Sequence, residues 1–85
     1  MSLKQFYVYI LECSDGTYYT SYTEDIVTIF KKHKFGTYSS YTKGRRPIKI
    51  IHLEKYITKT QAISRVARIK NMTKEQKQTL ALGPI

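Results

Sequence analysis

Cysteine and tryptophan are scarce in this 85-residue chain, which has Cys13 as its single cysteine and no tryptophan. One cysteine excludes an intramolecular disulfide and is typical of proteins of the reducing cytoplasm, where we therefore expect this chain to act. One cysteine and two distant histidines, His33 and His52, also match no zinc-ligand spacing. Cys13 lies in an apolar run, and we expect a small buried side chain there rather than a nucleophile.

Long hydrophobic runs are also absent. No stretch approaches the roughly 20 apolar residues that a membrane-spanning helix requires. The opening residues, MSLKQFYVYILEC, hold two tyrosines and no small-residue cleavage site, so they do not resemble a signal peptide. These absences predict a protein without a membrane partner.

Acidic residues are few: six Asp and Glu stand against fifteen Lys and Arg, which gives a formal net charge of +9 and a pI near 9.8. A positive field of this size favours polyanions, nucleic acid first and anionic membrane or ribosome surfaces second. The alternative is a lysine-rich protein whose charge serves solubility alone.

Hydrophobic residues make up 41% of the chain and eight side chains are tyrosine. We therefore expect one folded domain over residues 1–85, with a modest core.

The spacing of apolar residues predicts an α+β fold with the order ββαβαα, in which helices flank a small, three-stranded, largely antiparallel sheet. Asp15 and Gly16 separate two β-branched and aromatic runs, which indicates a hairpin because these turn positions need positive φ. Thr58 and Thr73 each open a capping-box pattern, which predicts the start of a helix. The expected elements are strands 5–13 and 17–22, a helix capped by Thr23 that ends at Gly36, a polar loop over 36–47, a mostly buried strand 48–56, a helix from 58 to about 70 and a short helix after Thr73.

Four motifs in this order resemble the GIY-YIG nuclease family, and in particular its small single-domain members. They are YVYIL, which contains Tyr9, then YTS, which begins at Tyr19, then DIVTIFKKH, which ends at His33, and finally YTKGRRP. The resemblance covers nearly the whole chain. It implies the fold expected above and a phosphodiesterase that cuts DNA in one step with a divalent metal, Mg²⁺ or Mn²⁺.

The same resemblance assigns roles to individual positions. Tyr9 and Tyr19 match the family's two motif tyrosines, and His33 matches a histidine on the helix that follows them. Without the family, both tyrosines would be interpreted as packing residues of the sheet, and His33 as a residue at the rim of an apolar helix face. Ser21 replaces the glycine that closes the second motif.

Two positions depart from the family in a way that affects catalysis. The phosphate-binding arginine is Ile29 in this chain, and the metal-binding glutamate is Val66. Mg²⁺ takes oxygen ligands, which valine lacks, and isoleucine offers no counterpart to the bidentate grip of arginine on phosphate. Losing one preorganised electrostatic group typically costs about a hundred- to a thousandfold in rate. We therefore expect no metal ligand, no small-molecule cofactor and impaired catalysis, unless a displaced carboxylate such as Glu54 serves instead.

Both departures complete apolar stripes at helical spacing. Ile29 continues the stripe of Ile26 and Phe30, and Val66 continues another stripe, formed by Ala62, Ile63 and Ile69. The sequence therefore predicts that part of the family's active site has become core.

The loop over 36–47 keeps aromatic and basic side chains that suit nucleic acid. Cations neutralise phosphates, and tyrosine rings stack on exposed bases. A solvated charged face is the alternative interpretation. No base-reading element is evident, so we expect recognition of the backbone or shape, and of DNA more than RNA. The residues expected to contact nucleic acid are Tyr38, Tyr41, Lys43, Arg45 and Arg46 in the loop, Lys31 and Lys32 on the first helix, and Arg65 and Arg68 on the second.

Three hypotheses of function follow from the sequence. The first is a nucleic-acid-binding protein on a catalytically impaired GIY-YIG scaffold. The second is an active metal-dependent endonuclease that uses Tyr9, Tyr19 and His33 with a displaced carboxylate. The third is a protein-interaction module whose basic face binds an acidic partner.

Overall fold

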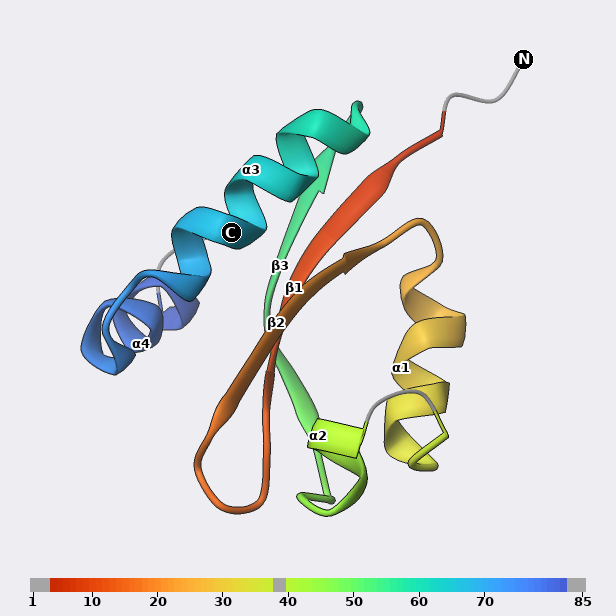
Figure 1. The fold of residues 1–85 in the computed structure, drawn as a ribbon, viewed down its shortest axis with the longest axis vertical. Helices are drawn as coiled ribbons and strands as arrows, with labels where there is room; N and C mark the ends of the chain where they lie inside the picture. Colours follow the sequence, from red (N-terminus) through yellow and green to blue (C-terminus); the bar gives the residue numbers. More distant parts are fainter. Residues whose placement is uncertain (1–3, 38–39, 83–85) are drawn as a thin grey trace.

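A computed structural model describes residues 4–37 and 40–82 of the chain. Its elements, in chain order, are β1 (Phe6–Glu12), β2 (Tyr18–Thr23), α1 (Ile26–Lys34), α2 (Ser40–Lys43), β3 (Lys49–Tyr56), α3 (Lys59–Lys70) and α4 (Lys74–Leu82). The strands form one antiparallel sheet in the order β2-β1-β3 (Figure 1). The predicted α+β class is confirmed. None of the described helices has the length and apolar character of a membrane span.

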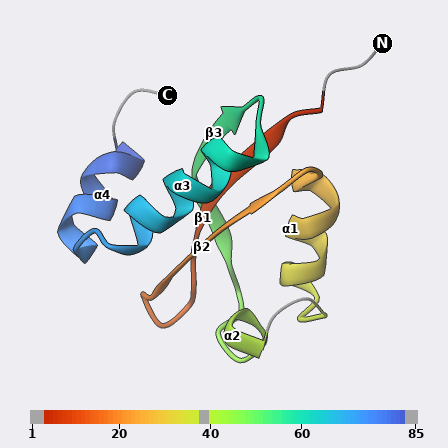
Figure 2. The same ribbon diagram turned by 45° about the horizontal axis from the view of Figure 1, so that its top comes forward.

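The central strand β1 presents two different faces. Side chains alternate along a strand, and Phe6, Val8 and Ile10 form the main core together with residues of α3. Tyr9, between Val8 and Ile10, points to the other face. Helices α3 and α4 lie on the first side of the sheet, whereas α1 and α2 lie on the second (Figures 1 and 2). The sheet therefore separates two helical layers.

Local sequence signals account for the hairpin and for two helix starts. The hairpin forms where it was predicted, and the Gly16 amide donates to the carbonyl of Cys13 at 3.0 Å. Only one of the two turn residues has the expected positive φ: Gly16 has φ of 81°, whereas Asp15 does not have a positive φ. The Thr58 hydroxyl accepts from the amide of Gln61 and begins α3. Cys13 is buried, as expected.

The second capping box begins α4 and forms in both directions. The Thr73 hydroxyl accepts from the Gln76 amide at 3.1 Å, and the Gln76 side chain accepts from the Thr73 amide at 2.9 Å. Both predicted helix starts at threonine are therefore confirmed, and the second has the complete capping box.

The start of α1 differs from the prediction. Asp25, not Thr23, is the N-cap: its carboxylate accepts from the amide of Thr28 at 3.1 Å and from the Thr28 hydroxyl at 2.7 Å. Thr23 is instead the last residue of β2, where its hydroxyl accepts from the Asp25 amide. A carboxylate that holds two donors is the stronger cap, so the helix begins two residues later than expected.

Three further expectations, one about the loop over 36–47 and two about burial, were wrong. The loop over 36–47 contains the one-turn helix α2. Strand β3 is not mostly buried: among its residues only His52 is, because β3 lies at the edge of the sheet. Ile63 is 46% exposed and does not share the buried stripe of its helix, which consists of Ala62, Val66 and Ile69.

A carboxylate on β3 attaches this strand to α3. Glu54 accepts from Arg65 Nε at 2.8 Å and from Arg65 Nη2 at 2.9 Å, and also from the Tyr56 hydroxyl at 2.6 Å. His52 Nε2 lies 2.7 Å from Glu54 Oε2, the oxygen that also accepts from Arg65 Nη2. Although burial alone would raise the pKa of Glu54, these hydrogen bonds lower it to about 2. Glu54 is therefore a structural anion on the α3 side of the sheet.

Candidate functional site

Tyr9, His33 and Thr42 form a buried chain of polar contacts on the α1 side of the sheet. Tyr9 Oη lies 3.1 Å from His33 Nε2, and His33 Nδ1 lies 2.9 Å from Thr42 Oγ1. The three residues come from β1, α1 and α2, and each is 0% exposed. The chain therefore joins three elements that are distant in sequence.

Tyr19 completes the group that the family resemblance implied. Its ring centroid lies 5.0 Å from that of His33 and 6.4 Å from that of Tyr9. Tyr19 is half-buried, whereas Tyr9 and His33 are fully enclosed. The structure brings the three predicted residues together but leaves only Tyr19 within reach of solvent.

The enclosed histidine is held in its neutral form. Burial lowers the pKa of His33 below the ordinary value, because a low-dielectric environment disfavours the imidazolium ion. A neutral ring donates from one nitrogen and accepts at the other. With the Tyr9 hydroxyl at one nitrogen and the Thr42 hydroxyl at the other, both roles are filled, and the ring orientation is fixed.

Thr42 was missed by sequence reasoning. It lies in a polar stretch in which no periodicity marks one threonine above its neighbours. Its burial follows from the turn of α2, which places it against the end of α1, so the contact with His33 is purely tertiary. No signal in the sequence could have identified it.

The two positions that depart from the family differ in burial. Val66 is 9% exposed and belongs to the core on the α3 side, together with Phe6, Val8 and Ile10. Ile29 is half-buried on α1. The prediction that Val66 is core is therefore confirmed.

The residues present do not fit a divalent metal. Near the Tyr9–His33 pair the described side chains offer hydroxyl groups and an imidazole, and the described part of the chain contains no group of three His, Cys, Asp or Glu that could hold a metal ion. Glu54 lies on the opposite face, because it is paired with Val8 across the β1–β3 ladder and bound to Arg65. The alternative that Glu54 approaches this site was therefore wrong.

The cations at the ends of α1 and α2, and Arg46 in the turn that follows α2, lie at one end of the molecule. Three lysines occupy the last turn of α1. Lys43 Cγ and Arg46 Cζ lie 3.2 and 3.1 Å from the place that a Cβ on Gly36, two residues beyond α1, would occupy. All five side chains are exposed. We call this group the α1–α2 surface; its members are Lys31, Lys32, Lys34, Lys43 and Arg46.

The other predicted contacts are placed differently. Arg45 Nε donates to Asp15 at 3.1 Å, and the Arg45 carbonyl accepts from the Ser14 amide, so this arginine secures the hairpin turn. Arg65 is committed to Glu54. Arg68 is exposed but lies on α3, across the sheet from the α1–α2 surface. Tyr38 and the side chain of Tyr41 lie outside the described part of the structure.

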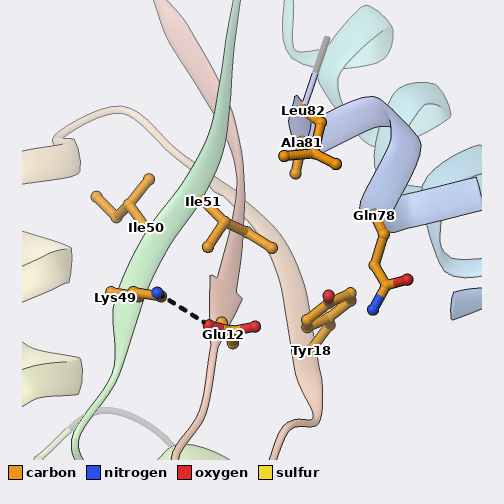
Figure 3. A pocket seen from close by; sticks show the side chains of 8 residues that line it. All are labelled: Glu12, Tyr18, Lys49, Ile50, Ile51, Gln78, Ala81 and Leu82. Atoms are coloured by element: carbon orange, nitrogen blue, oxygen red, sulfur yellow. Dashed lines mark ion pairs between the residues drawn. The ribbon is translucent and has the colours of Figure 1, made fainter. Parts of the chain in front are cut away.

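An apolar groove of about 480 Å³ lies between β3 and α4, away from these residues. Figure 3 shows Ile50, Ile51, Leu82 and other apolar side chains around it. The one cation in its lining, Lys49, is 3.2 Å from Glu12. None of the predicted site residues lines this groove, and its chemistry does not suit a phosphate.

Comparison with known proteins identifies the family. Residues 5–79 match the family described as the GIY-YIG catalytic domain. The chain is 45% identical over 75 residues to a UPF0213 protein of Haloquadratum walsbyi, covering 88% of this chain and 84% of the relative. It is 42% identical over 74 residues to a UPF0213 protein of Staphylococcus aureus, covering 87% and 90%.

Solved structures agree with this assignment. The solution NMR structure of a UPF0213 protein from Bacillus halodurans superimposes with a TM-score of 0.58 at 37% identity, covering 89% of this chain and 81% of that chain. The solution NMR structure of an E. faecalis protein gives a TM-score of 0.64 at 33% identity, covering 96% and 92%. The resemblance seen in the sequence motifs is therefore confirmed, and the chain belongs to the GIY-YIG family, as a relative of the UPF0213 proteins.

Proposed function

We propose that this protein binds nucleic acid, DNA in preference to RNA, on a GIY-YIG scaffold that has lost most or all of its catalytic power. The observation that carries the proposal is the contrast between two neighbouring regions. The cations of the α1–α2 surface are exposed, whereas Tyr9 and His33, beneath the same helices, are 0% exposed. The exposed cations are accessible to a polyanion, whereas the buried Tyr9 and His33 side chains, which would take part in catalysis, are not.

Binding through the α1–α2 surface rests on phosphate neutralisation. Each lysine or arginine that contacts a phosphate releases condensed counterions, so affinity falls steeply as salt rises. The lysines sit at the C-terminal end of α1, and nothing in their arrangement reads base edges. Recognition of the backbone, with little sequence preference, is the expected mode.

Impaired catalysis is supported by three features of the site. Ile29 and Val66 provide neither the positive charge nor the oxygen ligand that phosphodiester hydrolysis requires. Glu54 is held by Arg65 on the far side of the sheet. The buried Tyr9–His33 pair has no access to a scissile phosphate, since a general base must come within about 2.6–3.2 Å of the group it acts on.

The proposal predicts binding without cleavage. Labelled duplex, single-stranded and branched DNA, incubated with Mg²⁺ or Mn²⁺, should remain intact, whereas a gel-shift assay at low salt should show bound protein. Metal-dependent product that a chelator abolishes would instead support the active-endonuclease hypothesis. Absence of any shift at low salt would contradict nucleic-acid binding. Partners that stay attached in a pull-down after nuclease treatment would favour the protein-interaction module.

A reconstitution variant tests whether Ile29 and Val66 cause the expected loss of cleavage. Ile29→Arg combined with Val66→Glu restores the residue types that the family uses at these positions. Ile29→Arg combined with Ile63→Glu is the matched control, because Ile63 lies on the same helix but is 46% exposed. Val66 lies on the α3 side of the sheet, opposite Tyr9 and His33. Cleavage by the first double variant alone would therefore attribute the loss of catalysis to Ile29 and Val66 and would show that a carboxylate on that side can serve the site. Cleavage by the unmodified protein would contradict the proposal directly.

Removing charge from the α1–α2 surface should weaken binding for every DNA sequence alike. Lys43→Gln with Arg46→Gln should lower the slope of log Kd against log salt by up to about two, since each lost phosphate contact removes about 0.9. Arg45 is left intact because it holds Asp15. Lys4→Gln with Lys55→Gln, which removes the same charge elsewhere, should change Kd much less. Equal effects of the two variants would show that net charge alone governs binding.

A further inference from the structure

The acidic side chains are almost all committed to nearby partners. Four of the six form ion pairs with lysine or arginine, and a fifth, Asp25, caps α1. Glu75, in the first turn of α4, is the sixth. Most of the excess positive charge is therefore left without a local counter-charge. The ion pairs are Lys4–Glu24, Arg45–Asp15, Lys49–Glu12 and Arg65–Glu54.

Apart from Lys55 on β3, the remaining cations fall into two groups on opposite sides of the sheet. One group is the α1–α2 surface. The other follows α3 and α4; apart from Arg65, which pairs with Glu54, every cation there is exposed except the half-buried Lys77 (Figures 1 and 2). Within the described residues, neither group has an ion pair. We call the second group the α3–α4 surface; its members are Lys59, Arg68, Lys70, Lys74 and Lys77.

The two surfaces are far enough apart to act separately. The two helical layers lie on either side of the sheet, so their axes are separated by roughly 20 Å, given the spacing of about 10 Å between packed layers. This distance is about two and a half Debye lengths at physiological salt, where one length is about 8 Å. The field of one surface is therefore largely screened at the other, and each attracts polyanions independently.

A single duplex is poorly suited to contact both surfaces. The helices that carry the two surfaces lie on opposite sides of the sheet, so one duplex would have to bend sharply around a protein whose extents are 40 × 28 × 21 Å. Bending a site of 20–30 base pairs by only 40–90° already costs about 1–6 kcal/mol. Two separate duplexes avoid this cost.

We propose that the protein holds two DNA duplexes at once, one on the α1–α2 surface and one on the α3–α4 surface, and so bridges them. The proposal rests on the nucleic-acid binding proposed above and adds a second site. The α3–α4 surface is the weaker of the two, because its cations are spread along two helices, the first of which alone extends over about 18 Å. The chemistry required of the ligand is the phosphate backbone, without sequence preference.

A bridging assay tests this proposal. A biotinylated duplex is immobilised on beads, the protein is added at limiting concentration, and retention of a second fluorescent duplex of unrelated sequence is measured. Three triple Lys/Arg→Gln variants remove the same charge from different places. They are Lys31, Lys32 and Lys43 on the α1–α2 surface, Lys59, Arg68 and Lys70 on the α3–α4 surface, and Lys4, Lys49 and Lys55 on neither.

The unmodified protein and the third variant should retain the fluorescent duplex, and a large excess of protein should abolish retention by coating each duplex separately. Each of the first two variants should lose retention to background while still shifting a single duplex in a gel, which also shows that it is folded. Retention by either of these variants would mean that two copies of the chain bridge through one surface each, and would overturn the proposal. Binding by the unmodified protein without retention would overturn the bridge alone, whereas absence of all binding would overturn the proposed function.

Discussion

Glu54→Gln is expected to lower the free energy of unfolding by about 2–3 kcal/mol, because it removes the charge that Arg65 pairs with in a largely buried site. The side chains of Glu54 and Arg65 are only 17% and 22% exposed, so the guanidinium left behind is poorly solvated. Breaking a fully buried pair costs about 3–5 kcal/mol, and the residual exposure of this pair reduces that figure. Chemical denaturation of the two proteins measures the difference.

Glu12→Gln is the matched control. Glu12 pairs with Lys49, but these side chains are 33% and 71% exposed, and exposed pairs contribute about 0–1 kcal/mol. A similar loss in both variants would show that the Glu54 network has no special role in attaching α3 to β3.

The same carboxylate predicts how stability depends on pH. The folded-state pKa of Glu54 is about 2, below the ordinary value of 4.5, so the unfolded chain binds the proton first as the pH falls. The stability contributed by the ionised group is complete above the unfolded value and is lost between about pH 5 and pH 2. The difference in stability between the native protein and Glu54→Gln should therefore narrow over this range. A constant difference would contradict the assignment.

His33→Leu should destabilise the protein by about 2–4 kcal/mol and weaken the attachment of α2, which contains Thr42 and Lys43, to the rest of the fold. The substitution keeps most of the volume but removes a hydrogen-bond partner from the buried hydroxyls of Tyr9 and Thr42, and each such loss costs about 1–3 kcal/mol. Because Thr42 immediately precedes Lys43, DNA affinity should fall as well. Denaturation and gel-shift titrations measure the two effects.

A triple variant separates lost hydrogen bonds from lost packing. Tyr9→Phe, His33→Leu and Thr42→Val together replace the whole polar chain by apolar groups of similar shape, which can be nearly neutral for stability. This variant should therefore be more stable than His33→Leu alone. If it is less stable by the sum of three separate losses, the residues do not act as one connected chain. Lys34→Gln, next to His33 but exposed, should leave stability unchanged.

The sequence alone determined the features that depend on neighbouring residues. The hairpin turn at Gly16, the two threonine helix caps and the alternation of β1 involve residues a few positions apart. The hydrogen bonds of the turn and of the caps therefore form within one segment of the chain. The family motifs likewise stand in linear order. The fold class and the grouping of Tyr9, Tyr19 and His33 were accordingly predictable.

Only the tertiary structure decided which polar groups remain available to a partner. Arg45 and Arg65 look like their exposed neighbours in the sequence, but Asp15 and Glu54, 30 and 11 residues away, bind them. Thr42 became part of the candidate site because α2 folds against the end of α1. The central position of β1 in the sheet placed the two sets of cations on opposite sides. Charge counts measure how much positive charge a chain carries, whereas long-range pairing and burial determine where it can act.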